Sequence, residues 1–138
     1  MSDDLKKDTT QGKINDFEQK SQTIKMMGGD KQIKKQHDLN KLTARERLDL
    51  FFDKDTFQEV QLFVRHRSTL FGLDKKEIPA DGVITGFGKV NGRTVFSAAQ
   101  DFTSSGGSLG EMHAKKIWKI MDMAIAAQKP FVAINDSG

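Results

Sequence analysis

Gln100-Asp101-Phe102-Thr103-Ser104-Ser105-Gly106-Gly107-Ser108-Leu109-Gly110-Glu111-Met112-His113-Ala114-Lys115-Lys116-Ile117 is the most informative stretch of this sequence. Its pattern predicts a strand end, a loop rich in glycine and hydroxyl residues, and the first turns of a helix. Ser108 and Glu111 have the spacing of a capping box, which predicts that the helix begins just after Ser108. Glycines before a helix let the backbone approach a ligand, and the helix N-terminus favours an anion. The loop is therefore a candidate ligand-binding loop, with a tight structural connection as the alternative.

The predicted helix over residues 109–128 is apolar around most of its circumference. One polar stripe runs along it, made of Glu111, Lys115, Lys119 and Asp122, and most of its other residues are apolar. This pattern predicts a mostly buried helix that includes Trp118, with His113 across from the stripe as a hydrogen-bonded packing residue. The apolar run Phe131–Ile134 follows Lys129-Pro130 and is typical of a strand covered on both faces. Strand, helix and strand in this order predict a right-handed crossover between parallel strands.

A hairpin is predicted upstream of the loop. Asn91-Gly92 joins two strand-like segments, 83–90 and 93–98, because both residues of this turn tolerate positive φ. The turn sets the register, with Phe87 opposite Phe96 and Gly88 opposite Val95. A further strand is predicted over residues 57–64, and His66 after it is expected to have a surface or interface role.

The N-terminal third is polar and helix-favouring. A thin apolar stripe (Ile14, Phe17, Ile24 and Met27) predicts a helix over residues 5–27 that lies against another part of the molecule. Gly28-Gly29 ends it, and Asp30 is expected to cap a second helix. Thr43 and Glu46 form a second capping box, which predicts a third helix through Phe52. We therefore divide the chain into an N-terminal helical segment, 1–52, and an α/β segment, 53–138.

Composition narrows the functional classes. No apolar run approaches the roughly 20 residues of a membrane span, and the polar start is unlike a signal or transit peptide. The absence of cysteine excludes disulfides, cysteine nucleophiles and thiolate metal sites, and no metal site is expected. A net charge of +3 suits a phosphorylated cofactor but does not indicate nucleic-acid binding. The cytoplasm is the expected compartment.

Four motifs occur in a fixed order: Lys41-Leu42-Thr43-Ala44-Arg45-Glu46-Arg47-Leu48, Ile78-Pro79-Ala80-Asp81-Gly82-Val83-Ile84-Thr85-Gly86, the stretch quoted first, and Ile134-Asn135-Asp136-Ser137-Gly138. Over residues 26–138 the chain closely resembles the N-terminal part of the carboxyltransferase subunits of biotin-dependent acyl-CoA carboxylases. This is the family of the propionyl-CoA carboxylase beta chain and the methylmalonyl-CoA decarboxylase alpha chain. The resemblance implies an α/β fold, a partial crotonase-like ββα spiral preceded by N-terminal helices.

The resemblance also implies carboxyl transfer between carboxybiotin and an acyl-CoA of the propionyl-CoA or methylmalonyl-CoA type. The expected partners are a biotin carboxyl carrier protein, a biotin carboxylase subunit and further copies of the chain in a hexamer. No catalytic residue is expected within the chain, because the family's oxyanion glycines lie beyond Gly138, so the chain is expected to be an inactive fragment. Its expected contribution is part of a CoA cradle made of Phe102, Thr103, Ser104, Gly106, Gly107, Ser108, Ser137 and Gly138.

Three alternatives stay open from the sequence. The chain could be the alpha subunit of a sodium-pumping methylmalonyl-CoA decarboxylase, which runs the exchange in reverse. It could be a crotonase-type hydratase or isomerase with a glutamate acid/base pair, although the Thr43–Arg47 and Gly106–Glu111 motifs disfavour that reading. It could also be a non-catalytic basic binding module. Against that module, Tyr is absent and the one Trp is expected in a buried helix, so no stacking surface is evident.

Overall fold

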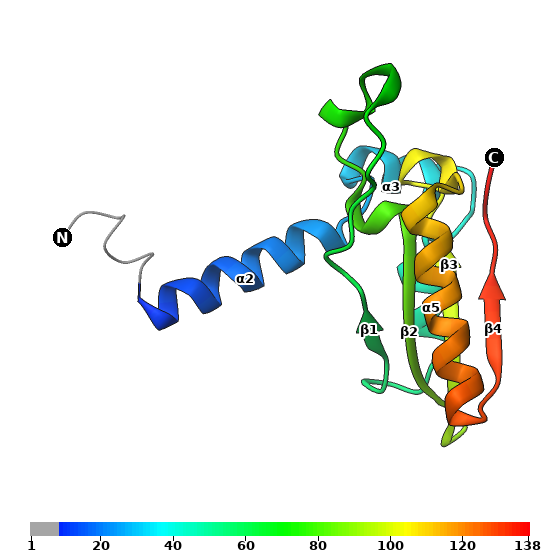
Figure 1. Ribbon diagram of the computed structural model, residues 1–138. Coiled ribbons are helices and arrows are strands. Elements are labelled where there is room, and N and C mark those ends of the chain that lie inside the picture. The colour runs from blue at the N-terminus through cyan, green and yellow to red at the C-terminus, as the bar shows by residue number, and fades with distance from the viewer. Residues whose placement is uncertain (1–8) are drawn as a thin grey trace.

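The computed structural model describes residues 9–138, and four strands form one sheet in the order β1-β2-β3-β4 (Figure 1). The strands are β1 (Gln58–Val60), β2 (Val83–Val90), β3 (Arg93–Gln100) and β4 (Phe131–Ile134). β2 pairs antiparallel with both β1 and β3, whereas β3 and β4 are parallel. The predicted α/β class and the parallel pairing around the helix are confirmed.

The hairpin has the predicted register, since Phe87 pairs with Phe96 and Gly88 with Val95. Asn91 and Gly92 have φ of 50° and 76°, as the turn requires. The predicted strand over residues 57–64 is wrong beyond Val60. Gln61 has φ of 63°, a left-handed conformation that ends the extended chain.

Alternate residues of β3 pack into two separate clusters, one on each face of the sheet. Val95 and Ala99 join the cluster that contains Leu48 of α4 (Ala44–Phe51). Phe96 and Ala98 join the cluster that contains Ile120 and Ala124 of α5 (Glu111–Ala127). The period of two in a strand thus places α4 and α5 on opposite faces.

The N-terminal helices are α2 (Thr10–Lys25), α3 (Asp30–Asp38) and α4. α2 projects away from the sheet (Figure 1), and residues 5–8 of the predicted helix lie outside the described residues. The Thr43–Glu46 capping box is confirmed: Glu46 N donates to Thr43 Oγ1 at 3.3 Å, and Thr43 N donates to Glu46 Oε2 at 2.8 Å. Asp30 is not a cap but the first residue of α3, after Gly29 with φ of 77°.

The predicted capping box at the start of α5 is wrong. Gly110 occupies the N-cap position, and the Ser108 hydroxyl instead donates to the carbonyl of Ser105. Asp81 replaces the box from a distant part of the chain, because its carboxylate accepts a hydrogen bond from His113 N at 2.7 Å. Asp81 belongs to the short 3-10 turn η2 (Pro79–Gly82), so this bond ties α5 to the segment before β2.

α5 is not mostly buried, contrary to the sequence prediction. Its outer face leaves Trp118 66% and Ile125 73% exposed, because the sheet covers only one side of the helix. β4 is likewise half-buried rather than covered on both faces. The described chain therefore presents an uncovered apolar surface on α5.

Candidate functional site

The 101–108 loop and the 135–138 turn lie together at one edge of the sheet. They follow β3 and β4, and parallel strands end at the same edge. Gly138 N donates to the carbonyl of Gly106 at 3.0 Å. The structure thus brings the two halves of the predicted cradle into contact.

The loop backbone is held in a left-handed conformation over three residues. Ser105, Gly106 and Gly107 have φ of 52°, 65° and 65°. Asp101, which is 1% exposed, fixes the start of the loop by accepting hydrogen bonds from the Thr103 amide (2.8 Å) and the Thr103 hydroxyl. Burial raises the pKa of Asp101 despite these bonds.

Gly28 connects this loop to the N-terminal helices. Its amide donates to Thr103 Oγ1 at 3.2 Å, and a Cβ at Gly28 would lie 1.9 Å from the Thr103 carbonyl oxygen. A glycine is therefore required at this position for the helical segment to approach the loop.

A hollow of about 470 Å³ lies over the loop, which we call the loop hollow. Phe102, Thr103, Ser104 and Gly106 of the predicted cradle line it, together with Gly28, Gln32 and Lys76 from the N-terminal and central segments. Gly107 is not part of this lining. It faces the 135–138 turn, where an added Cβ would come within 2.1 Å of the Asp136 carbonyl oxygen. Ser108, Ser137 and Gly138 lie outside the lining but are exposed beside it.

Sequence reasoning missed the Asp136 cluster, which fixes the 135–138 turn. Its carboxylate accepts hydrogen bonds from Lys41 Nζ (2.8 Å), Arg47 Nη2 (2.8 Å) and Gln36 Nε2 (3.2 Å). Burial alone would raise the pKa of Asp136, but the hydrogen bonds and charges of Lys41 and Arg47 outweigh it and hold the pKa below its ordinary value.

Lys41 also lies over the Phe102 ring, 4.7 Å from its centroid. Lys41, from the N-terminal helical segment, therefore contacts both the 101–108 loop and the 135–138 turn. The signal available in the sequence was an acidic residue in a glycine turn and basic residues in the 41–47 motif. Nothing in the sequence spacing indicates that Lys41 and Asp136, which are 95 positions apart, contact each other.

A buried polar chain runs from this turn to the start of α5. Asp136 N donates to Gln100 Oε1 at 3.2 Å, and Gln100 Nε2 lies 3.4 Å from His113 Nε2. His113 Nδ1 donates to the Asp81 carbonyl at 2.8 Å, because a carbonyl only accepts. Burial lowers the pKa of His113, consistent with a neutral ring. The prediction of a hydrogen-bonded packing histidine is confirmed.

Lys116 is a second group that the sequence did not mark. It is 1% exposed, and its ammonium donates to the carbonyls of Ala80 (2.7 Å) and Val83. Burial lowers its pKa to about 8. Lys116 thus joins α5 to the η2 turn beside Asp81.

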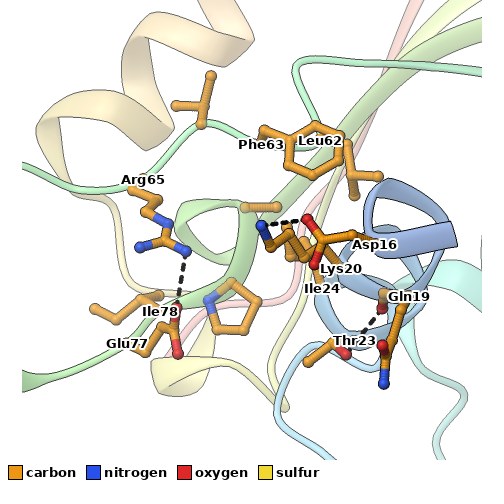
Figure 2. Close-up of a pocket in the computed structure, with 13 residues that line it drawn as sticks. Asp16, Gln19, Lys20, Thr23, Ile24, Leu62, Phe63, Arg65, Glu77 and Ile78 are labelled. Atoms are coloured by element: carbon orange, nitrogen blue, oxygen red, sulfur yellow. Dashed lines mark hydrogen bonds and ion pairs between the residues drawn. The ribbon is translucent and has the colours of Figure 1, made fainter. Parts of the chain in front are cut away.

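An apolar hollow of about 370 Å³ separates α2 from the segments that flank η2 (Figure 2). Ile24, Leu62, Phe63 and Ile78 form its apolar walls, with two ion pairs at the rim: Lys20–Asp16 at 2.6 Å and Arg65–Glu77 at 3.1 Å. It shares Glu77 and Pro79 with the loop hollow, so the two hollows adjoin.

A family model named "Carboxyl transferase domain" matches residues 35–138. The chain belongs to the carboxyl transferase domain family. The chain is 54% identical to the methylmalonyl-CoA decarboxylase subunit alpha of Propionigenium modestum, over 91% of this chain and 24% of that protein. It is 49% identical to the mitochondrial propionyl-CoA carboxylase beta chain of Homo sapiens, over 88% and 23% respectively. The chain therefore spans about a quarter of the length of these relatives.

Solved carboxyltransferase structures have the same fold. The transcarboxylase 12S subunit, solved as a hexamer assembly with methylmalonyl-coenzyme A and methylmalonic acid bound, superposes with a TM-score of 0.92 at 45% identity. The match covers 94% of this chain and 26% of that one. The beta subunit of P. aeruginosa geranyl-CoA carboxylase gives a TM-score of 0.73 at 22% identity, which shows the fold alone. The predicted partial crotonase-like fold is thereby confirmed.

Residues 9–138 contain no cluster of three or more His, Cys, Asp or Glu residues placed to hold a metal ion. Within the same range, no helix is both long and apolar enough to cross a membrane.

The sequence argument against a non-catalytic binding module assumed that Trp118 is buried. Trp118 is exposed, so that argument is wrong. Family membership disfavours that module instead.

Proposed function

We propose that this chain forms the first part of an acyl-CoA carboxyltransferase, with the loop hollow and the 135–138 turn as part of its acyl-CoA site. The observation that carries the proposal is the contact between two glycine-containing backbone segments, Gly138 N to Gly106 O, at the carboxyl ends of two parallel strands. Ligands of open α/β sheets bind at this edge. Methylmalonyl-coenzyme A is bound in the superposable 12S subunit.

The chemistry proposed for the complete site is carboxyl transfer between biotin and propionyl-CoA or methylmalonyl-CoA. Carboxylated biotin, held on a carrier protein, supplies the carboxyl group. An enolate of the acyl-CoA is stabilised by preorganised backbone N–H groups, which need no reorganisation when charge develops. We assign the described chain no catalytic side chain and no biotin contact, and we place the oxyanion donors in a later segment.

Within this chain, the residues act by binding and positioning. Phe102, Thr103, Ser104 and Gly106 face the loop hollow, and Gly107, Ser108, Ser137 and Gly138 complete the cradle around it. Asp136 holds the turn against Lys41 and Arg47 of the N-terminal helical segment. We propose residues 1–52 as that helical segment and 53–138 as the start of the carboxyltransferase domain.

The proposed partners are a biotin carboxyl carrier protein, a biotin carboxylase subunit and further copies of the same chain in a hexamer. The proposed compartment is the cytoplasm.

A chimera tests the proposal. The quarter of the Propionibacterium freudenreichii carboxyltransferase 12S subunit that this chain matches, at 45% identity, is replaced by residues 1–138. Radiolabelled carboxyl transfer to propionyl-CoA is then measured for the chimera, for the isolated chain and for the 12S subunit without that quarter. We expect transfer by the chimera alone. A folded, assembled chimera without transfer, or turnover by the isolated chain, contradicts the proposal.

A further inference from the structure

The buried polar chain between the 135–138 turn and α5 has a backbone group at each end. At one end the Asp136 amide donates to Gln100 Oε1 at 3.2 Å, and at the other His113 Nδ1 lies 2.8 Å from the Asp81 carbonyl oxygen. A backbone amide can only donate a hydrogen bond, and a carbonyl can only accept one. These two backbone groups therefore determine the direction of every hydrogen bond between them.

The Gln100 amide has one orientation that satisfies the chain. Its oxygen must face Asp136 N, so its NH₂ group faces His113 Nε2, 3.4 Å away. Nε2 must then accept, which leaves the ring proton on Nδ1, the atom that donates to the Asp81 carbonyl. The chain of hydrogen bonds is complete only when His113 is neutral and carries its proton on Nδ1.

Protonation of His113 is incompatible with this arrangement. A proton on Nε2 places an N–H group against the Gln100 NH₂ group, so that two donors face each other. Rotation of the Gln100 amide by half a turn satisfies the ring but directs the NH₂ group at the Asp136 amide, which is again a donor. One hydrogen bond is lost in either case, and in the second case it is the bond that holds the 135–138 turn.

The surroundings of His113 favour the neutral ring. The residue is fully buried, and burial is the main cause that lowers its pKa below the ordinary value of 6.5. Two charged groups also act on this pKa: Asp81 of η2 raises it, and Lys116 of α5 lowers it. From the end of β3, the ring meets only the uncharged Gln100 amide among its hydrogen-bonding neighbours in residues 9–138.

We propose that Gln100 positions the 135–138 turn under the control of His113: the neutral ring holds the Gln100 amide oxygen toward Asp136 N, and the protonated ring releases it. The Asp136 carboxylate keeps its own contacts with Lys41 and Arg47, so the turn is loosened rather than detached. The inference concerns the turn itself and goes beyond the proposed function, because it does not depend on the ligand that the turn contacts.

Nuclear magnetic resonance of the 138-residue chain tests the inference in the wild type. Ring nitrogen shifts report the tautomer and the titration of His113, and hydrogen exchange reports the protection of the Asp136 amide relative to an unfolded chain. At pH 7 we expect the Nδ1–H tautomer. As the pH falls through the midpoint of the ring's titration, protection of the Asp136 amide should fall about tenfold, the effect of one lost hydrogen bond. Coincidence of the two midpoints distinguishes His113 from Asp101, whose pKa burial raises.

Gln100→Glu is the test variant. A carboxylate accepts hydrogen bonds from both the Asp136 amide and protonated His113, so this variant should hold the turn with a charged ring. We expect its His113 midpoint to lie above the ordinary 6.5 and its Asp136 protection to be equal at pH 7 and pH 5. Gln100→Met removes both hydrogen bonds and should show low Asp136 protection at every pH.

The matched control is His37→Gln, which removes a histidine that contacts Glu46 outside the polar chain. Its Asp136 protection should follow pH as in the wild type. An Nε2–H tautomer of His113 at pH 7 overturns the inference, as does Asp136 protection that stays constant while the ring titrates. If acid unfolds the wild type before the ring titrates, Gln100→Glu at pH 7 decides: a charged ring with retained protection supports the inference, and a neutral ring overturns it.

Discussion

The carbonyl oxygen of Asp136 lies directly against Gly107, where an added Cβ would be 2.1 Å away. Real Cβ atoms do not approach an oxygen so closely, so the loop after β3 and the turn after β4 touch only because residue 107 is glycine. This contact explains Gly107 without a ligand. The glycine that the sequence marked as part of a CoA cradle supports that cradle from beneath.

Gly107→Ala should therefore destabilise the chain by roughly 3 kcal/mol, from the combined left-handed strain and steric clash. Gly106→Ala is the matched control, because Gly106 has the same φ of 65° but an added Cβ there meets nothing within 4 Å. Gly106→Ala should cost only the strain, about 1 kcal/mol. Urea denaturation measures both, and equal losses would show that the contact with Asp136 is unimportant.

Asp136→Asn should lower stability by about 2 kcal/mol at pH 7, because it removes the charge shared by Lys41 and Arg47. Asp38→Asn is the control. It breaks the exposed Lys34–Asp38 pair, whose side chains are 76% and 61% exposed, and should change stability very little.

The Asp136 contribution should also depend on pH. Its pKa is lowered in the folded chain, so its stabilisation is fully present above the unfolded value of about 4 and is lost as the pH falls through the folded value. The difference between wild type and Asp136→Asn should be constant from pH 7 to 5 and shrink below pH 4. A difference that persists undiminished at pH 2 would exclude the ion pairs as its cause.

Lys116 makes stability depend on pH in the alkaline range rather than the acidic range. Its folded pKa of about 8 lies below the unfolded value of about 10.4, so between these values the unfolded chain binds more protons. Stability should therefore rise from pH 8 to 10 relative to Lys116→Met, whose other titrating groups are the same. Chemical denaturation at pH 7, 8, 9 and 10 measures this. Parallel curves for the two proteins would show that burial does not lower the pKa of Lys116.

The exposed face of α5 should make the chain self-associate. Trp118 and Ile125 are 66% and 73% exposed on one apolar face. Light scattering should show a mass that grows with concentration, and Trp118, the one tryptophan, should shift its fluorescence to the blue in parallel. Ile125→Lys should reduce both effects. A compact monomer at high concentration would rule out association through this face.

Local patterns predicted the local structure well. Asn91-Gly92 determined a hairpin register and Thr43–Glu46 determined a helix start, because each depends on residues close in sequence. The Ser108–Glu111 box failed for a reason outside its own segment. Asp81, 32 residues before His113, provides the cap instead.

The strand after Phe57 and the burial of α5 failed because both depend on the surroundings rather than on the apolar pattern. The candidate loop was found from its glycines. The Asp136 cluster was not, since its donors at positions 36, 41 and 47 are brought to it by the fold. Sequence resemblance supplied the family, and the structure supplied the contacts that connect the N-terminal helices to the loop and turn.

Hydrogen exchange of the chain with and without methylmalonyl-CoA tests most directly whether the loop and turn form part of an acyl-CoA site. We predict slower exchange on ligand addition for amides 102–108 and 135–138, with no change in β1, on the far edge of the sheet. Unchanged exchange of 102–108 and 135–138 at saturating ligand would contradict the proposed site.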